Sequence, residues 1–147
     1  MFMRKGVLML SFITLFIVRN FSVQGQRTMA NSLAGIYSVA YVTVPNNDVA
    51  KKIAHGLVSK KLAACVNIIP QITSIYEWEN KITEDNELLL MIKTRTETVG
   101  NLTEYVKENH PYKVCEVISL PIENGNKDYL NWIGNIVPSS STKASST

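Results

Sequence analysis

The stretch from Leu62 to Lys93 constrains the fold most, because its pattern predicts one long β-hairpin. Apolar and polar residues alternate through its first half, as they do in a strand that buries one face. This alternation predicts one common face for Ala64, Val66, Ile68, Ile72, Tyr76 and Trp78. The chain then turns at residues 78–81, where Asn80 tolerates the positive φ of a hairpin turn, and an apolar strand returns toward Lys93.

The composition of this hairpin has two consequences. Pro70 lies inside the first strand, and because proline has no N–H to donate, we expect it at a bulge or on an exposed edge. The hairpin is also longer and more apolar than one small domain can cover. A long uncovered apolar edge invites pairing with another chain, so the sequence predicts an oligomer.

Residues 1–28 form a separate leader. It begins with Arg4 and Lys5 and continues as an apolar run over residues 6–18, which is too short to span a bilayer comfortably. This length favours a secretory signal over the alternative, an uncleaved membrane anchor. A signal would direct the protein to the secretory route or a membrane, whereas translation from Met29 would give a cytoplasmic product without the leader.

The leader also accounts for the formal net charge of +3. Of the 15 Lys and Arg residues, four lie in the leader, and all 12 acids lie beyond it, so 11 bases remain in the rest of the chain. No basic stripe is left there, and nucleic acid is therefore not an expected partner. Cys65 and Cys115 both lie in apolar runs, where we expect buried free thiols rather than a disulfide.

Periodicity and capping residues predict the other elements of a domain over residues 29–137. They are strands at 36–44 and 114–120 and helices at 46–61, at 96–109 and from Asn126 onward. The apolar stripe of the last helix is expected to contain Tyr129, Trp132, Ile133 and Ile136. Residues 138–147 are rich in Ser and Thr, which predicts a disordered tail. The order β-α-β-β-α-β plus a helix predicts an α+β, ferredoxin-like fold with an antiparallel sheet and helices on one face.

His110-Pro111-Tyr112, between the second helix and the last strand, is the most chemically suggestive triplet. An imidazole there is a good ligand for copper or zinc, and the alternative is a capping or hydrogen-bonded histidine. Glu116 is an acid within an apolar strand, so an inward side chain would need a partner such as Lys93. Trp78 and its acidic neighbours suit either a ligand crevice or a subunit interface.

The sequence does not contain the motifs of common catalytic sites. It has no Ser/His/Asp set, no glycine-rich phosphate loop, no H-E-x-x-H and no paired C-x-x-C, so we do not expect an enzyme. Asn101-Leu102-Thr103 is a glycosylation sequon, which has meaning only if the chain is secreted.

Several motifs occur together in a characteristic order and spacing. They are Leu62-Ala63-Ala64-Cys65-Val66-Asn67, Tyr76-Glu77-Trp78-Glu79, Met91-Ile92-Lys93-Thr94, His110-Pro111-Tyr112, Glu116, Leu120-Pro121 and Tyr129-Leu130-Asn131-Trp132. Through them residues 36–137 resemble the CutA (divalent-cation tolerance) family, and the chain looks most like its animal members, which similarly carry an apolar leader. The resemblance implies a ferredoxin-like homotrimer whose long hairpins pair between subunits.

The resemblance also implies a function. It implies binding of copper or another divalent cation and, for the animal proteins, a role in processing, localisation or membrane anchoring of acetylcholinesterase. The likeness of such trimers to PII-type proteins implies signalling or assembly by analogy. In this hypothesis Trp78, Lys93, Tyr112 and Glu116 line a ligand crevice between subunits, and His110 is the metal donor.

The chain departs from the copper-associated pattern of this family in two places. Bacterial members associated with copper place a cysteine near the end of the first strand and two successive histidines before Pro-Tyr. Here the strand ends Tyr41-Val42-Thr43-Val44 and the pair is Asn109-His110, so only His110 carries over. A single imidazole binds metal weakly unless other subunits add ligands, and we therefore expect weakly bound copper at most.

Overall fold

A computed structural model describes residues 33–139 of the 147-residue chain. The leader at 1–28 and most of the tail at 138–147 lie outside the described residues, so the predictions for them stay predictions. None of the helices between residues 33 and 139 is long and apolar enough to cross a membrane. The elements in chain order are β1 (Tyr37–Val44), α1 (Asn47–Ser59), β2 (Cys65–Trp78), β3 (Lys81–Arg95), the 3-10 helix η1 (Thr96–Thr98), α2 (Val99–Asn109), β4 (Ile118–Pro121) and α3 (Lys127–Ile136).

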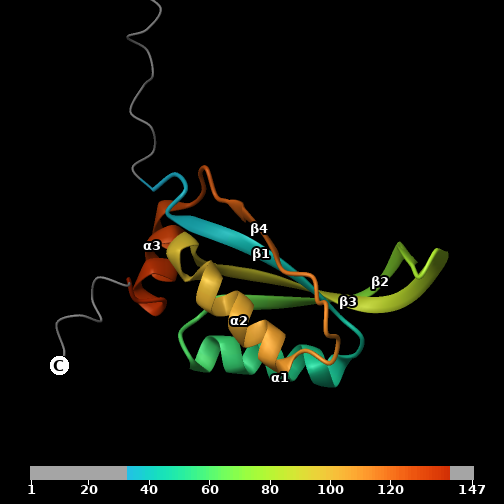
Figure 1. Ribbon diagram of the computed structural model, residues 1–147. Coiled ribbons are helices and arrows are strands. Elements are labelled where there is room, and N and C mark those ends of the chain that lie inside the picture. The colour runs from blue at the N-terminus through green and yellow to red at the C-terminus, as the bar shows by residue number, and fades with distance from the viewer. Residues whose placement is uncertain (1–32, 140–147) are drawn as a thin grey trace, which may run out of the picture. The chain divides into compact units, whose positions relative to one another are not determined.

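The four strands form one antiparallel sheet in the order β2-β3-β1-β4 (Figure 1). β1 is central: it pairs with β3 along its whole length and with β4 from Ser38 to Tyr41. Together with the element order, this pairing confirms the prediction of an α+β, ferredoxin-like fold.

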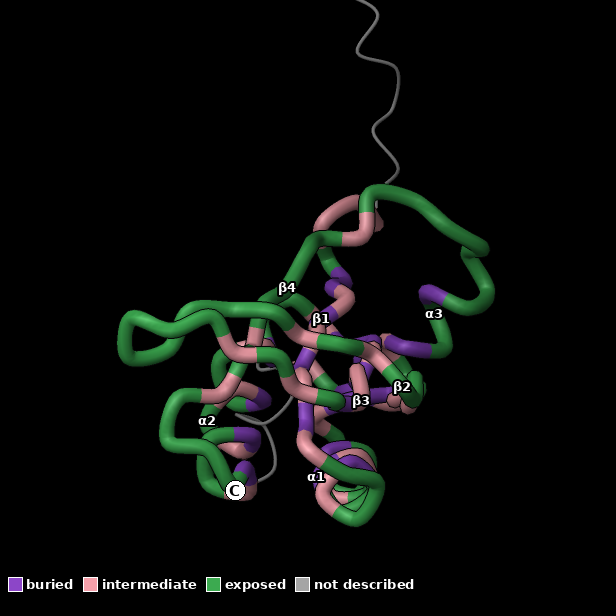
Figure 2. The backbone as a smooth tube through the Cα atoms, turned by 90° about the vertical axis from the view of Figure 1, so that its right-hand side faces the viewer, coloured by how far each residue is buried: buried purple, intermediate pink, exposed green. Residues whose placement is uncertain are grey.

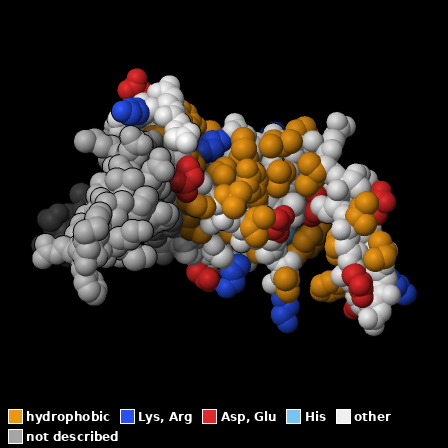
Figure 3. Space-filling model, turned by 90° about the horizontal axis from the view of Figure 1, so that it is seen from above, with side chains coloured by type: hydrophobic (Ala, Val, Ile, Leu, Met, Phe, Trp, Pro, Cys, Tyr) orange, Lys and Arg blue, Asp and Glu red, His pale blue; other side chains and the backbone are white. Residues whose placement is uncertain are grey.

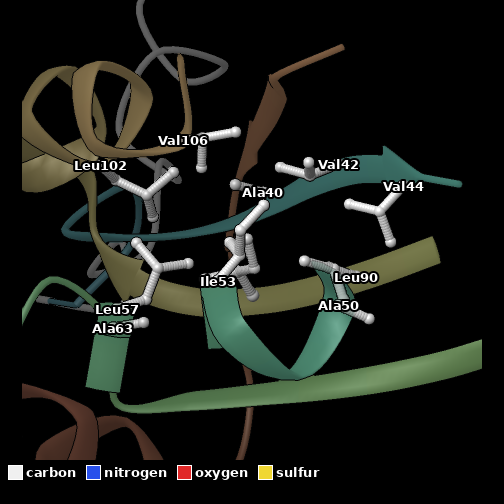
Figure 4. Packing of buried hydrophobic residues seen from close by; sticks show 11 residues of the cluster. Ala40, Val42, Val44, Ala50, Ile53, Leu57, Ala63, Leu90, Leu102 and Val106 are labelled. Atoms are coloured by element: carbon white, nitrogen blue, oxygen red, sulfur yellow. The ribbon is translucent and has the colours of Figure 1, made fainter. Parts of the chain in front are cut away.

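Helices α1 and α2 pack on one face of the sheet, which we call the covered face (Figures 2 and 4). The predicted cap of α1 is confirmed, because the Asn46 side chain accepts a hydrogen bond from the Val49 N–H at 3.0 Å. The side chains of the two helices and of alternate strand residues form the main core. Its members are Ala40, Val42, Val44, Ala50, Ile53, Leu57, Ala63, Leu90, Ile92, Leu102 and Val106.

Helix α3 lies on the opposite face of the sheet, so the prediction of helices on one face is confirmed for α1 and α2 but does not hold for α3 (Figure 2). Its inner stripe packs with Tyr37 in a second core made of Tyr37, Ala64, Leu130, Ile133 and Val137. Arg95 of β3 fixes the helix end by donating to the Gly134 and Val137 carbonyls at 2.9 and 2.6 Å. Of the predicted stripe only Ile133 is fully buried, since Tyr129 and Trp132 remain 42% and 39% exposed beside it.

Among residues 33–139, no helix packs on the rest of this second face, and we call it the open face. Its residues pair with one another across all four strands: Val39, Tyr41, Asn67, Ile69, Leu89, Met91, Lys93, Ile118 and Leu120. Most are apolar, and Ile118 and Leu120 are 56% and 58% exposed. Seen from above, hydrophobic side chains gather over the middle of the molecule (Figure 3). The subunit therefore leaves an apolar sheet surface in water.

The long hairpin contains a β-bulge at Pro70, as predicted. From Ile69 to Ile72, β2 advances three residues while its partner β3 advances only two. Gln71 has a positive φ of 61°, which accommodates the extra residue. β2 is also an edge strand, so the missing N–H of Pro70 disrupts no ladder on its outer side.

The bulge exchanges the two faces of β2, and the predicted common face from Ala64 to Trp78 is therefore wrong. Before the bulge, Val66 and Ile68 pack on the core of the covered face. After it, the same alternation places Ile72, Tyr76 and Trp78 on the side of the open face. The sequence pattern correctly predicted alternating faces along β2, but the one extra residue at the bulge moved the following side chains to the opposite face.

The hairpin turn has the predicted position. Glu79 and Asn80 have positive φ values of 49° and 61° and connect the paired residues Trp78 and Lys81. Two successive positive φ values are typical of a type I′ turn, whose twist matches that of the flanking strands. Because β1 ends opposite Leu88, the outer half of the hairpin extends past the rest of the sheet (Figure 1).

Strand β4 is shorter than predicted. The sequence indicated a strand over residues 114–120, whereas the structure has one only at Ile118–Pro121. We attribute the short strand to Thr43 of β1, just beyond Tyr41, the last residue that pairs with β4. The Thr43 carbonyl accepts a hydrogen bond from the His110 ring at 2.9 Å. With this acceptor occupied, residues 111–117 pass over the end of β1 without extending the ladder.

Candidate functional site

A cavity of about 900 Å³ lies between the outer half of the hairpin and the segment that follows α2. Its hairpin wall is formed by Ser74, Ile75, Tyr76, Trp78, Asp85 and Glu87. The opposite wall is formed by Pro111, Tyr112, Lys113, Val114 and Glu116, and Thr43 of β1 completes the lining. We call it the hairpin cavity. Its volume lies in the range of about 300–1,000 Å³ that is usual for small-molecule sites.

The bulge in β2 decides which side chains face this cavity. Ser74 pairs with Asp85 and Tyr76 with Thr83, so the residues at 74, 76, 78, 85 and 87 all project from one side of the hairpin. Without the extra residue at the bulge, Ser74 and Tyr76 would project from the other side. The cavity wall is therefore a direct product of the local backbone irregularity.

Two hydrogen bonds fix the carboxylates of this wall. Ser74 Oγ donates to Glu87 Oε2 at 2.6 Å, and Tyr76 OH donates to Asp85 Oδ2 at 2.5 Å. Both are short, as expected when a hydroxyl donates to an ionised acceptor. Glu87 is buried, with only 7% of its surface exposed, whereas Tyr76 is 41% exposed at the rim.

The lining has an excess of negative charge, since three carboxylates face one lysine, Lys113. The hydrogen bond to Asp85, followed by desolvation and by the charge of that carboxylate, raises the pKa of Tyr76 to about 12. Desolvation also raises the pKa of Tyr112, and the negative charges of Glu87 and Asp85 raise it further. Both shifts have the direction that a negative electrostatic potential in the cavity produces.

The structure brings three of the predicted crevice residues together, since Trp78, Tyr112 and Glu116 all line the hairpin cavity. Trp78 is 57% exposed near the hairpin turn, and Tyr112 is 43% exposed on the opposite wall. Glu116 is exposed and precedes β4, so it needs no partner inside the subunit. The expectation that it lies within a strand is wrong.

Lys93, the fourth predicted crevice residue, does not line this cavity. It lies six residues from Glu87 along β3, a separation of about 20 Å at the rise of a strand. Its ammonium group donates to the Asn67 side chain and to the Met91 carbonyl on the open face. Lys93 is only 8% exposed, and no described carboxylate forms an ion pair with it.

His110, the predicted metal donor, is held by both ring nitrogens. Nδ1 accepts a hydrogen bond from the Tyr112 N–H at 3.0 Å, so the ring proton is on Nε2, which donates to the Thr43 carbonyl. The ring is 9% exposed and makes an edge contact with the Tyr112 ring at 5.1 Å. This geometry corresponds to the alternative considered from the sequence, a hydrogen-bonded histidine. Metal ligation by His110 stays a prediction, and it would require breaking one of these bonds.

Residues 33–139 contain no cluster of three or more His, Cys, Asp or Glu side chains arranged to hold a metal ion. Cys65 and Cys115 are free thiols, as predicted, but both are half-buried rather than buried. Within one subunit, the cavity therefore offers dispersed carboxylate oxygens rather than a closed coordination shell.

Sequence reasoning missed Asp85, Glu87 and Ser74. Asp85 and Glu87 lie at alternate positions of a strand, which places them on one face, and this signal was present in the sequence. Which face they occupy depends on pairing with β2, and that pairing depends on the bulge.

Comparison with known proteins gives a consistent result. The model of the CutA1 divalent ion tolerance protein family matches residues 38–135. A Xenopus laevis Protein CutA homolog is 58% identical over 134 residues, covering 90% of this chain and 89% of that protein. Human Protein CutA is 57% identical over 105 residues, covering 71% of this chain and 59% of that protein. The crystal structure of CutA1 from Oryza sativa aligns with a TM-score of 0.71 and 51% identity, covering 74% of this chain and 100% of that one.

Proposed function

The chain belongs to the CutA1 family of divalent ion tolerance proteins, and from this premise we propose that it is a homotrimer without catalytic activity that binds divalent cations weakly. Membership confirms the resemblance seen in the sequence motifs. The observation that carries the cation-binding proposal is the acidic hairpin cavity, where three carboxylates face one lysine. The trimer proposal rests on a separate feature, the open face.

The open face supports assembly because its composition suits contact with protein rather than water. Extended apolar surfaces of this kind mark interaction sites. Leu120 pairs with Val39, and Ile118 pairs with Tyr41, so the exposed side chains continue one apolar surface across the strands. The outer hairpin adds Trp78 and Ile82, which are 57% and 74% exposed. We propose that neighbouring subunits cover these residues.

Sedimentation equilibrium of the purified protein tests the assembly. We expect a trimer, and we expect Leu120→Glu to shift it toward monomer, because the new carboxylate would be desolvated at the interface. Val58→Glu is the matched control, since Val58 is an exposed apolar residue of α1 away from the open face. A monomeric native protein, or equal behaviour of both variants, would contradict the proposal.

The donors present in the cavity suit hard divalent cations better than copper. Carboxylate oxygens suit ions such as Mg²⁺ and Mn²⁺, whereas copper prefers imidazole or sulfur. The imidazole of His110 has no free ring nitrogen in this conformation. Copper binding is proposed here only as weak binding, strengthened where other subunits supply additional ligands.

Titration calorimetry with Cu²⁺, Zn²⁺ and Mn²⁺ tests the cation proposal. We expect weak binding that Glu116→Gln reduces and that His110→Ala changes little, because the carboxylates supply the charge. Tight copper binding lost in His110→Ala would instead make that histidine a ligand. No heat from any of the three ions would refute cation binding at this site.

The alternative, a secretory-route protein that acts on acetylcholinesterase, stays a prediction from the family resemblance. This alternative requires that the protein is exported, and export can be tested at the sequon. Asn101 is exposed on α2 and is therefore accessible to glycosylation. Mass spectrometry of the mature protein would detect a cleaved leader and a glycan on Asn101. An unmodified product that begins at Met29 would favour a cytoplasmic location.

A further inference from the structure

We propose that the hairpin cavity binds a small organic cation, in which a protonated amine or guanidinium meets Glu87 and an apolar body contacts the aromatic walls. This inference deepens the proposed function, on which it rests for the identity of the site. It concerns the chemical class of the ligand. A divalent ion alone would contact the carboxylates of the cavity but would leave its aromatic and apolar walls without a partner.

Glu87 is a buried carboxylate without a counterion among the described residues. Only 7% of its surface is exposed, and no Lys, Arg or His of the described chain lies within ion-pair distance. The bond from Ser74 Oγ satisfies Oε2 and locks the carboxylate in place, but it supplies no positive charge. Because burying an unpaired charge is costly, a cation that enters the cavity would meet a fixed carboxylate whose charge is not compensated by the described residues of this subunit.

Aromatic rings form part of both walls of the cavity. Tyr76 and Trp78 line the hairpin side, and Tyr112 lines the side opposite. Aromatic faces attract cations through the ring quadrupole, and tryptophan does so best. Tyr112 is oriented by its neighbour, since its N–H donates to His110 Nδ1 and the two rings are in edge contact. Carboxylates and rings around one cavity are the features by which proteins recognise ammonium and guanidinium groups.

The size of the cavity also favours an organic ligand. A volume of about 900 Å³ is far larger than a metal ion needs and suits an organic molecule. Residues 33–139 contain no group of three or more side chains arranged to coordinate a metal. Val114 and Ile75 give the lining an apolar part, which a bare hydrated ion would not use.

Calorimetric titration of the intact protein with 2-phenylethylammonium and with its neutral isostere 2-phenylethanol tests the inference. The two probes share a ring and differ in charge. We expect the ammonium to bind at least tenfold more tightly, and we expect Glu87→Gln to remove most of that difference. This substitution retains an oxygen that accepts from Ser74, so the local fold is preserved. Glu123→Gln, an exposed acid outside the cavity, is the matched control and should change nothing.

Each of the following results would overturn the inference, and each for a different reason. Equal binding of both probes, or binding unaffected by Glu87→Gln, would show that charge recognition is absent. Heat from Mn²⁺ or Zn²⁺ without heat from the ammonium would refute the organic cation and leave the proposed function intact. If neither probe binds and Glu87→Gln weakens the trimer in sedimentation, the counterion of Glu87 is a side chain of a neighbouring subunit instead.

Discussion

The two faces of the sheet are made by the same strands, and they differ in what covers them. On the covered face, Leu90 and Ile92 of β3 are completely buried under α1 and α2. On the open face, their neighbour Met91 is only partly buried, and Leu120 of β4 is 58% exposed. Both faces are apolar, so hydrophobicity alone does not distinguish the interior of a subunit from an uncovered surface. The covering helices make that distinction.

The largest effect is expected on the covered face, from Ile92→Ala. Ile92 is fully buried in the main core, so truncation removes apolar contacts and leaves a cavity. We expect the free energy of unfolding to fall by about 2–5 kcal/mol. Chemical denaturation would measure this, and a loss below about 1 kcal/mol would contradict the assignment of Ile92 to the core.

A smaller effect is expected from Trp78→Ala, at the end of the hairpin. This side chain is 57% exposed in the subunit, so its loss should barely change subunit stability. If it anchors a neighbouring subunit, trimerisation should weaken by about 2 kcal/mol per site, the usual cost of truncating an aromatic anchor. Sedimentation at several protein concentrations shows whether Trp78 lies inside or outside the subunit interface. A trimer that is unchanged in Trp78→Ala would place Trp78 outside it.

Met91→Ala compares the covered and open faces most directly, because Met91 adjoins Ile92 and projects to the opposite face. We expect a loss of about 1 kcal/mol in the assembly, as less apolar surface is buried there. In contrast to Ile92→Ala, the loss should depend on protein concentration, since it arises between subunits. A concentration-independent loss as large as that of Ile92→Ala would remove the distinction between the faces.

The smallest effect concerns the ionisation of Tyr76 in the hairpin cavity. Its pKa of about 12 depends foremost on the hydrogen bond to Asp85, so Asp85→Asn should lower it toward the ordinary value of 10.0. Because the folded-state pKa is raised, the stabilising contribution of Tyr76 is complete below pH 10 and is lost as the pH rises through 12. Phenolate absorbance measures the shift, with Asp48→Asn on α1 as control. An unchanged titration curve would show that Asp85 does not control Tyr76.

The sequence was sufficient for most of the fold, because most elements have strong local signals. Asn46 and Asn126 begin α1 and α3, and Asn80 lies in the hairpin turn. One feature depended on a contact between distant residues. The shortened β4 follows from a hydrogen bond between His110 and Thr43, 67 residues apart, and no local pattern encodes that bond.

The candidate site could be predicted only in part for the same reason. Trp78 and Tyr112 were predicted as crevice residues through the family resemblance, and both line the hairpin cavity. Glu87 was not recognised, because its burial depends on how the hairpin curves and on the segment at 111–116. Lys93 was placed in the same crevice, but along β3 it points to the sheet surface where Asn67 accepts its hydrogen bond.

The bulge at Pro70 makes β2 a strand of two independent halves. Before the bulge, Val66 and Ile68 pack against the interior of the subunit, whereas after it Ser74, Tyr76 and Trp78 line the hairpin cavity. Substitutions after the bulge are therefore expected to change the cavity more than the folding of the subunit, whereas substitutions before it are expected to change folding more than the cavity. Deleting the single residue Gln71 would join the two halves into one continuous pattern, and it would turn Ser74 and Tyr76 away from their carboxylate partners.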